Sequence, residues 1–155
     1  MKAYPIPHGS IHIELEDAGD WRLLSHMLMD ARAEGYDLAA DLCGMIADDE
    51  VAEDWRDFVL PDLRDKFDEA LKRVTGVIGE AYAEHQGGSG RVIIPRDASM
   101  DWYGVLNRAR LALEARHHFA AQEKPVQAGS EKHAARLRDR LYCALQSLLL
   151  DHAFD

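Results

Sequence analysis

The sequence has few of the features that mark secreted or membrane-bound proteins. It contains two cysteines, Cys43 and Cys143, whose spacing fits neither a metal knuckle nor a redox pair. No stretch approaches the roughly 18 consecutive apolar residues of a transmembrane helix, and the opening residues MKAYPIPHGSIHIE contain no apolar signal-peptide region. These absences predict a cytoplasmic protein with reduced thiols.

Positive charge is also scarce. The chain has 28 acidic residues against 18 Lys and Arg, which gives a formal net charge of −10. This balance argues against binding to nucleic acid or to an anionic membrane, because both require positive surface charge. The densest basic segment, residues 132–140, follows Glu131 and is interrupted by Asp139. We interpret it as a solvated helix face, and a transcription factor is not among the favoured functions.

The motifs of common active sites are missing as well. The sequence has no Gly-x-Ser-x-Gly motif, and no nucleophile stands near a convincing base. The loop QGGSG at residues 86–90 lacks the Lys-Ser/Thr pair that completes a phosphate-binding loop. We therefore assign no catalytic residue and expect no cofactor and no metal, so enzymatic activity has no support in the sequence.

The 155 residues have an ordinary globular composition, with 47% apolar and 30% charged residues, and their number fits one domain spanning 1–155. The alternation of apolar and polar residues at 11–16 predicts a strand, and RVIIP at 91–95 predicts its partner. Residues 1–9, which include Pro5 and Pro7, are expected to be irregular. Alternating helical patterns with two short strands do not support a parallel α/β sheet.

Helical periodicity dominates the remainder of the chain. The tract at residues 51–85 has an apolar stripe that includes Trp55, Val59, Leu63 and Phe67. A break or kink is expected near Leu60, with Pro61 at the start of the longer second piece, because proline cannot donate a backbone hydrogen bond inside a helix. The predicted fold is mainly α, a four- to five-helix bundle around a central buried helix with a small two-stranded β-ribbon. The helices are expected at residues 20–33, 37–47, 51–85, 99–122 and 131–153.

The segment Ser99–Gln122 is expected to be the central helix, with Ser99 or Asp97 as its N-cap. Its apolar stripe at helical spacing comprises Trp102, Val105, Leu106, Ala109, Leu113 and Ala120. Arg116 falls within this stripe and Arg110 at its margin. A buried guanidinium needs a counter-charge, so both arginines are expected to meet carboxylates from the 48–69 region. An anion site remains the alternative, because arginine offers a planar fork of donors.

Two further groups have both a structural and a chemical interpretation. Glu114 and His117 have the Glu-x-x-His spacing of helical di-iron sites, but a second such pair is missing. The acidic run from Asp48 to Glu50 could bind a metal, yet such runs more often stabilise the N-terminus of a helix. We favour the structural interpretation of both.

Two segments resemble motifs of an uncharacterised bacterial family. They are W-x3-LNRARLALEAR, from Trp102 to Arg116, and YCALQSLL, from Tyr142 to Leu149; the segment WRDFVLPDLRDKF, which begins at Trp55, fits more loosely. Members of that family are often encoded beside ClpS, the adaptor that delivers substrates to the Clp protease. The resemblance implies a regulatory or adaptor role near proteolysis, and it brings no known catalytic residues.

The favoured hypothesis is a cytoplasmic protein-interaction or regulatory module with a protein partner, and a homodimer is compatible with it. The alternative is a binding protein or enzyme for a small anionic ligand. That alternative draws on polar residues that stand out in the two family-like segments. They are Asn107, Arg110, Arg116, Tyr142 and Gln146.

Overall fold

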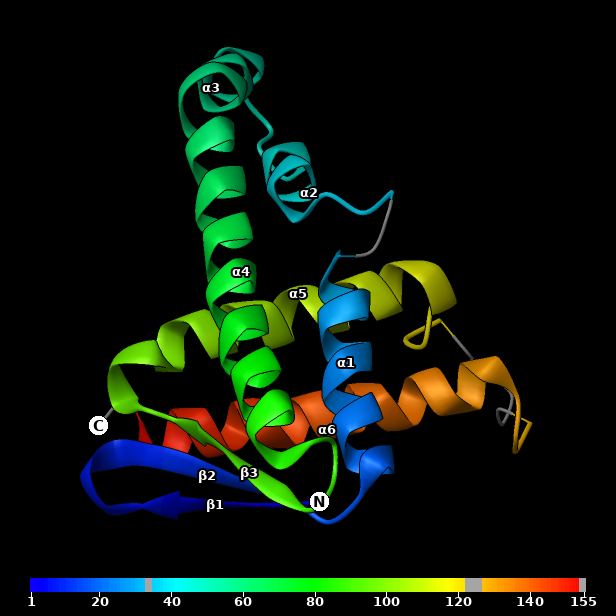
Figure 1. The fold of residues 1–155 in the computed structure, drawn as a ribbon. Coiled ribbons are helices and arrows are strands. Elements are labelled where there is room, and N and C mark those ends of the chain that lie inside the picture. The colour runs from blue at the N-terminus through cyan, green and yellow to red at the C-terminus, as the bar shows by residue number, and fades with distance from the viewer. Residues whose placement is uncertain (33–34, 122–126, 154–155) are drawn as a thin grey trace.

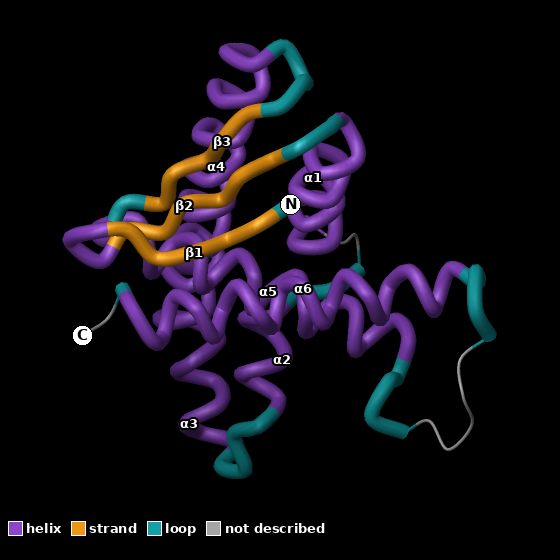
Figure 2. The backbone as a smooth tube through the Cα atoms, turned by 90° about the horizontal axis from the view of Figure 1, so that it is seen from below, coloured by secondary structure: helices purple, strands orange, loops and turns teal. Residues whose placement is uncertain are grey.

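A three-stranded antiparallel sheet lies at one end of the molecule, and helices cover its inner face (Figure 1). The computed structural model describes residues 1–32, 35–121 and 127–153. The strands β1 (Lys2–Ile6), β2 (Ser10–Leu15) and β3 (Gly90–Ile94) lie side by side in chain order, as Figure 2 shows. Alternate residues of β2 and β3 are buried, which is the period-2 pattern expected of a sheet with one covered face.

The strand β1 was not predicted, because its prolines argued for irregular chain. Pro5 pairs with Ile11 in the register of β1 and β2. A proline is compatible with this position because β1 is an edge strand, where a missing N–H need not interrupt a ladder. The predicted two-stranded ribbon is therefore a three-stranded sheet. The bounds of β2 and β3 differ from those of the two predicted strands by one residue at each end.

The helices α1 (Ala18–Arg32), α4 (Leu60–His85) and α6 (Glu131–His152) all contact α5 (Ser99–His117), which confirms a mainly helical fold around a central helix. Figure 1 shows α1 and α4 side by side, crossing α5 and α6. The predicted stripe of α5 is buried from Trp102 to Leu113, and Trp102 is only 1% exposed. The core continues into β2, β3 and α6.

The ends of α5 differ from the prediction. Its N-cap is Ala98, without a side-chain hydrogen bond, because the short helix η3 (Arg96–Ala98) leads directly into it. It ends at His117, and His118 adopts a left-handed conformation with φ of 50°. Ala120 is consequently exposed rather than part of the stripe. The predicted helix ends at Ala33 and Gln122 lie outside the described residues.

The tract from Asp49 to His85 is irregular just before Leu60, where an irregularity was expected, but its helical turns are not interrupted. It runs from α3 (Asp49–Asp54) through the π-helical turn η2 (Trp55–Val59) into α4. Within the turn, the Leu60 N–H donates to the Trp55 carbonyl, which is the wider π spacing. Pro61 stands at the start of α4, as predicted, where its missing N–H costs little.

Side-chain caps begin α6 and α2 (Leu38–Gly44), and the cap at Ser130 is the one expected from its position before the last helix. The Ser130 hydroxyl accepts a hydrogen bond from the His133 N–H at 3.1 Å at the start of α6. Asp37 caps α2, where its carboxylate accepts from the Ala39 and Ala40 N–H groups. These short polar side chains satisfy helix N–H groups that have no partner within the helix.

Candidate functional site

Two of the predicted ligand residues, Arg110 and Gln146, meet at the interface of α5 and α6. Arg110 Nη1 donates to Gln146 Oε1 at 2.7 Å, and Arg110 Nε donates to Asp139 Oδ1 at 3.0 Å. Gln146 is buried, and its Nε2 lies 3.5 Å from the Tyr103 carbonyl. The polar atoms of this pair are thus bound to neighbouring helices. The contact is an internal link between α5 and α6, and it leaves little of Gln146 for a ligand.

Tyr142, another predicted ligand residue, belongs to a different cluster. Its hydroxyl donates to Asp30 Oδ2 at 2.9 Å, and Arg138 Nε donates to the same oxygen at 2.8 Å. Asp30 is 6% exposed and Tyr142 1%. Burial and the neighbouring Asp30 carboxylate raise the pKa of Tyr142 well above its usual range. This cluster joins α1 to α6, and no pattern in the sequence had indicated Asp30.

The predicted carboxylate partners of the two arginines were wrong. Arg110 pairs with Asp139 of α6, and the arginine of α5 that reaches the 48–69 region is Arg108, whose Nη1 lies 3.0 Å from Asp68 Oδ1. The error follows from geometry, since α6 packs along the side of α5 that carries Arg110. Asn107 is half-buried on α5.

Arg116 was placed on the buried stripe, but it is exposed, because it lies in the last turn of α5 beyond the core. Within the described residues no carboxylate forms an ion pair with it. It lines a pocket of about 520 Å³ together with Arg32 and Arg138. Asp30 and Glu131 line the same pocket, so negative charge offsets much of its positive charge.

The Glu-x-x-His pair also has a structural role. Glu114 accepts hydrogen bonds from the Phe119 and Ala120 N–H groups, both at 3.1 Å, and so holds the turn that follows α5. The ring of His117 stacks on Phe119 with centroids 5.5 Å apart. Burial lowers the pKa of His117. Across the described ranges, no three His, Cys, Asp or Glu side chains gather as metal ligands would.

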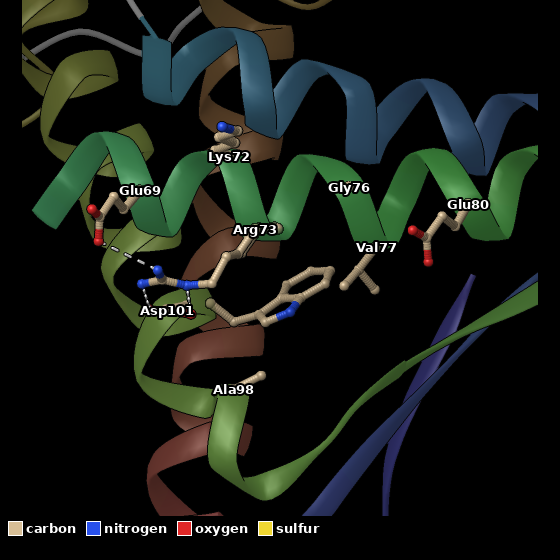
Figure 3. A pocket seen from close by; sticks show the side chains of 10 residues that line it. Glu69, Lys72, Arg73, Gly76, Val77, Glu80, Ala98 and Asp101 are labelled. Atoms are coloured by element: carbon tan, nitrogen blue, oxygen red, sulfur yellow. Dashed lines mark hydrogen bonds and ion pairs between the residues drawn. The ribbon is translucent and has the colours of Figure 1, made fainter. Parts of the chain in front are cut away.

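A larger pocket of about 620 Å³ lies between α4 and the start of α5 (Figure 3). Trp102 lines it, and Lys72 and Glu80 stand on the α4 side. Arg73 Nε donates to Asp101 Oδ2 at 2.6 Å, and its Nη2 donates to Asp101 Oδ1 at 2.9 Å. This bidentate pair fastens α4 to α5 and occupies the guanidinium fork of Arg73, so that arginine has no free pair of donors for an anion.

The third region of interest is the part of the chain farthest from the sheet, where α2 and α3 lie beside the distal end of α4 (Figure 1). We call residues 36–67 the distal lobe. Its small core is separate from the main core and consists of Ala39, Cys43, Ala52 and Leu60, with Ile46, Trp55, Leu63 and Phe67 packed against it.

Polar contacts hold the distal lobe together. The Asp37 carboxylate accepts from Arg64 Nε at 2.8 Å, which links the start of α2 to α4. The hydrogen bond from Arg64 lowers the pKa of Asp37. Asp48 caps α3 by accepting from the Glu50 and Val51 N–H groups, so the acidic run does begin a helix. By contrast, the buried indole N–H of Trp55 has no hydrogen-bond partner among the described residues.

The surface of the distal lobe combines exposed apolar side chains with excess negative charge. Met45 is 78% exposed and Phe58 73%, the two highest values among the large apolar residues that the structure describes. Val51 is 52% exposed. The lobe also has ten acidic residues against three basic ones, whereas the remainder of the chain has eighteen against fifteen.

The sequence itself contains a signal for this surface. Phe58 falls off the predicted apolar stripe of its helix, although it is large and apolar. Val59, which was placed on that stripe, is 36% exposed, because the π-helical turn rotates the chain between Asp54 and Leu60. An apolar residue that does not fit the core-facing period is a candidate for contact with another molecule.

No helix in the described ranges combines the length and apolar character needed to cross a lipid bilayer. The comparison with curated proteins and that with solved structures found no match for this chain. The model of one protein family, described as a domain of unknown function (DUF2017), matches residues 15–151. That match spans α1 through almost all of α6 and includes the distal lobe, so the chain belongs to the DUF2017 family.

Proposed function

We propose that this protein is a protein-interaction module that engages its partner through the distal lobe. The observation that carries the proposal is the exposure of Phe58 on an element with its own small core. A phenyl ring that is 73% exposed gains little from the fold, and large aromatic side chains contribute strongly to binding when a partner covers them. The position of the lobe at the far end of α4 makes it accessible to a partner (Figure 1).

The resemblance described above suggests the setting of this interaction. If the gene lies beside that of ClpS, as in many relatives of the family it resembles, the module acts in the bacterial cytoplasm in connection with Clp-type proteolysis. The acidic composition and the absence of a catalytic constellation in the sequence support a regulatory or adaptor role over an enzymatic one.

The test compares the proteins captured by the wild type with those captured by Phe58→Ser. Met100→Ser is the matched control, because Met100 is 67% exposed but lies at the start of α5, outside the distal lobe. Both substitutions replace exposed side chains, so each should change the free energy of unfolding by less than about 0.5 kcal/mol. We expect the wild type and Met100→Ser to capture a partner that Phe58→Ser does not capture. The purified partner should also bind the purified wild type directly. Equal capture by all three proteins would contradict the proposal.

The pocket that contains Arg116 favours a second candidate function, the binding of a small anion. Arg116 and Arg32 are both exposed, and they line the same pocket. A calorimetric titration with inorganic phosphate tests this candidate, with Arg116→Met as the variant. Saturable binding that Arg116→Met abolishes would support an anion site. Equal heats from the wild type and the variant would contradict anion binding by this pocket.

A further inference from the structure

The chemistry of the distal lobe indicates which kind of partner it accepts. The exposed apolar residues Val51 and Phe58 are seven residues apart on the continuous helix formed by α3 and η2. Phe58 lies within the π-helical turn, which follows α3 without interruption, so the two residues are close along one stretch of helix and both are exposed to a partner. Asp54, three residues after Val51 and four before Phe58, stands between them along the chain and is exposed.

Further carboxylates surround this helix face. Glu50 and Asp57, each next in sequence to one of the two apolar residues, are exposed. Of the basic residues of the lobe, Arg64 is already paired with Asp37. Among described residues, none forms an ion pair with Glu50, Asp54 or Asp57. Arg56 and Lys66 are exposed as well, but with ten acidic residues against three basic ones the lobe keeps a clear excess of negative charge. The face therefore presents apolar side chains within net negative charge.

This combination excludes several possible occupants of the face. An anionic membrane or a nucleic acid would be repelled by the carboxylates. A second copy of the same lobe would bring two equally acidic surfaces together, which is unfavourable at the range of about 8 Å over which charges act at physiological salt. A partner must instead supply apolar contacts and positive charge together.

We propose that the distal lobe binds a basic amphipathic segment of a partner protein, with Val51 and Phe58 against the apolar face of that segment and Glu50, Asp54 and Asp57 facing its Lys or Arg side chains. This inference rests on the proposed function and adds the chemical class of the partner. A helix with an apolar stripe and a basic flank fits such a surface.

The experiment uses synthetic helical peptides and the full chain labelled with ¹⁵N, and it follows backbone amide shifts by NMR. The first peptide has leucine and lysine at helical spacing, which gives one apolar and one basic face. The second has the same composition in scrambled order, and the third has glutamate in place of lysine. We expect the first peptide to shift amides within residues 36–67, the scrambled peptide to bind at least tenfold more weakly, and the acidic peptide to leave the spectrum unchanged.

Variants of the protein separate the two contributions. Phe58→Ser should weaken binding of the first peptide at least tenfold. The combination of Glu50→Gln, Asp54→Asn and Asp57→Asn should weaken it by at least as much. The combination of Glu80→Gln, Glu84→Gln and Asp151→Asn is the matched control, since it removes three exposed carboxylates outside the lobe. It should bind as the wild type does. Binding should also weaken as salt rises from about 50 mM to about 500 mM.

Several results would overturn the inference. Equal binding of the scrambled peptide would show charge attraction without an apolar contact, and shifts spread over the sheet and α6 would place the contact elsewhere. Binding of none of the peptides would also overturn it. Concentration-dependent sedimentation of the protein alone that Phe58→Ser abolishes would make a second copy the occupant. If the acidic peptide binds the lobe instead, the partner chemistry is wrong but the docking function stands. That function fails separately, if Phe58→Ser loses no partner.

Discussion

The buried cluster of Asp30, Arg138 and Tyr142 offers the sharpest test of how α1 is held against α6. Asp30→Asn keeps the size of the side chain and removes its charge. The Arg138 guanidinium, only 15% exposed, would then remain without its counter-charge. Breaking a buried pair from one side costs about 3 to 5 kcal/mol. Because the asparagine oxygen can still accept one hydrogen bond, we expect a loss of about 3 kcal/mol in the free energy of unfolding.

Tyr142→Phe removes only the hydroxyl donor and leaves the ion pair in place. A hydrogen bond to a charged group contributes about 1.5 to 3 kcal/mol, and the smaller value applies here because Arg138 continues to bind the same oxygen. The double variant should lose less than the sum of the two single losses, because Asp30→Asn weakens the hydrogen bond that Tyr142→Phe removes. The coupling should be about 1 kcal/mol.

Urea unfolding of the wild type, the two single variants and the double variant, followed by circular dichroism, measures these differences. The free energies are compared between proteins whose m-values are equal. A loss of less than about 1 kcal/mol for Asp30→Asn would refute the reasoning, because that is the range of a solvent-exposed pair. Alkaline pH provides an independent check. The pKa of Tyr142 is raised in the folded protein, so its contribution is complete below its ordinary pKa of 10.0 and is lost as the pH rises above that value. Tyr142→Phe should lack this alkaline loss.

Three further predictions concern other parts of the molecule. Arg110→Met should cost about 1 to 2 kcal/mol in urea unfolding, because it leaves the buried Gln146 oxygen without its donor; an unchanged midpoint would show that the contact contributes nothing. Burial lowers the pKa of His117 in the folded protein, so the unfolded chain takes up the proton first, and stability should fall as the pH drops below about 6.5. His117→Gln should show a shallower fall between about pH 7 and 5, and identical slopes would contradict the assignment. Cys43, buried in the small core of the distal lobe, should react with a thiol reagent in a Cys143→Ser background through an opening that costs less free energy than global unfolding. Equal free energies from labelling and from urea unfolding would show that the lobe opens only with the rest of the chain.

Periodicity predicted those features of the fold that depend on local sequence. The buried stripe of α5 follows from residues three and four apart, and the capping role of Ser130 follows from its position before an apolar-periodic helix. The edge strand β1 was missed because its evidence is long-range: Pro5 is read locally as a turn residue, and only pairing with β2 makes it part of a strand.

The candidate sites show the same division between local and long-range information. Arg110 and Gln146 were recognised as unusual, but their partners depend on which helices pack together, and Asp30 lies 108 residues from Arg138. The exposure of Phe58 depends on the π-helical turn, which changes the helical period within Trp55–Val59. Apolar spacings of three and four residues assume a regular α-helix and do not reveal such a turn. Long-range packing and irregular helical turns are therefore the steps that single-sequence reasoning could not supply.

The central claim is that the distal lobe contacts a partner protein, and site-specific photo-crosslinking in the native cells tests it most directly. A photoreactive amino acid is placed at Phe58 in one strain and at Met100 in another, since both positions are highly exposed. We predict a discrete crosslinked protein from position 58 that is absent from position 100. The same crosslinks from both positions, or none from position 58, would contradict the claim.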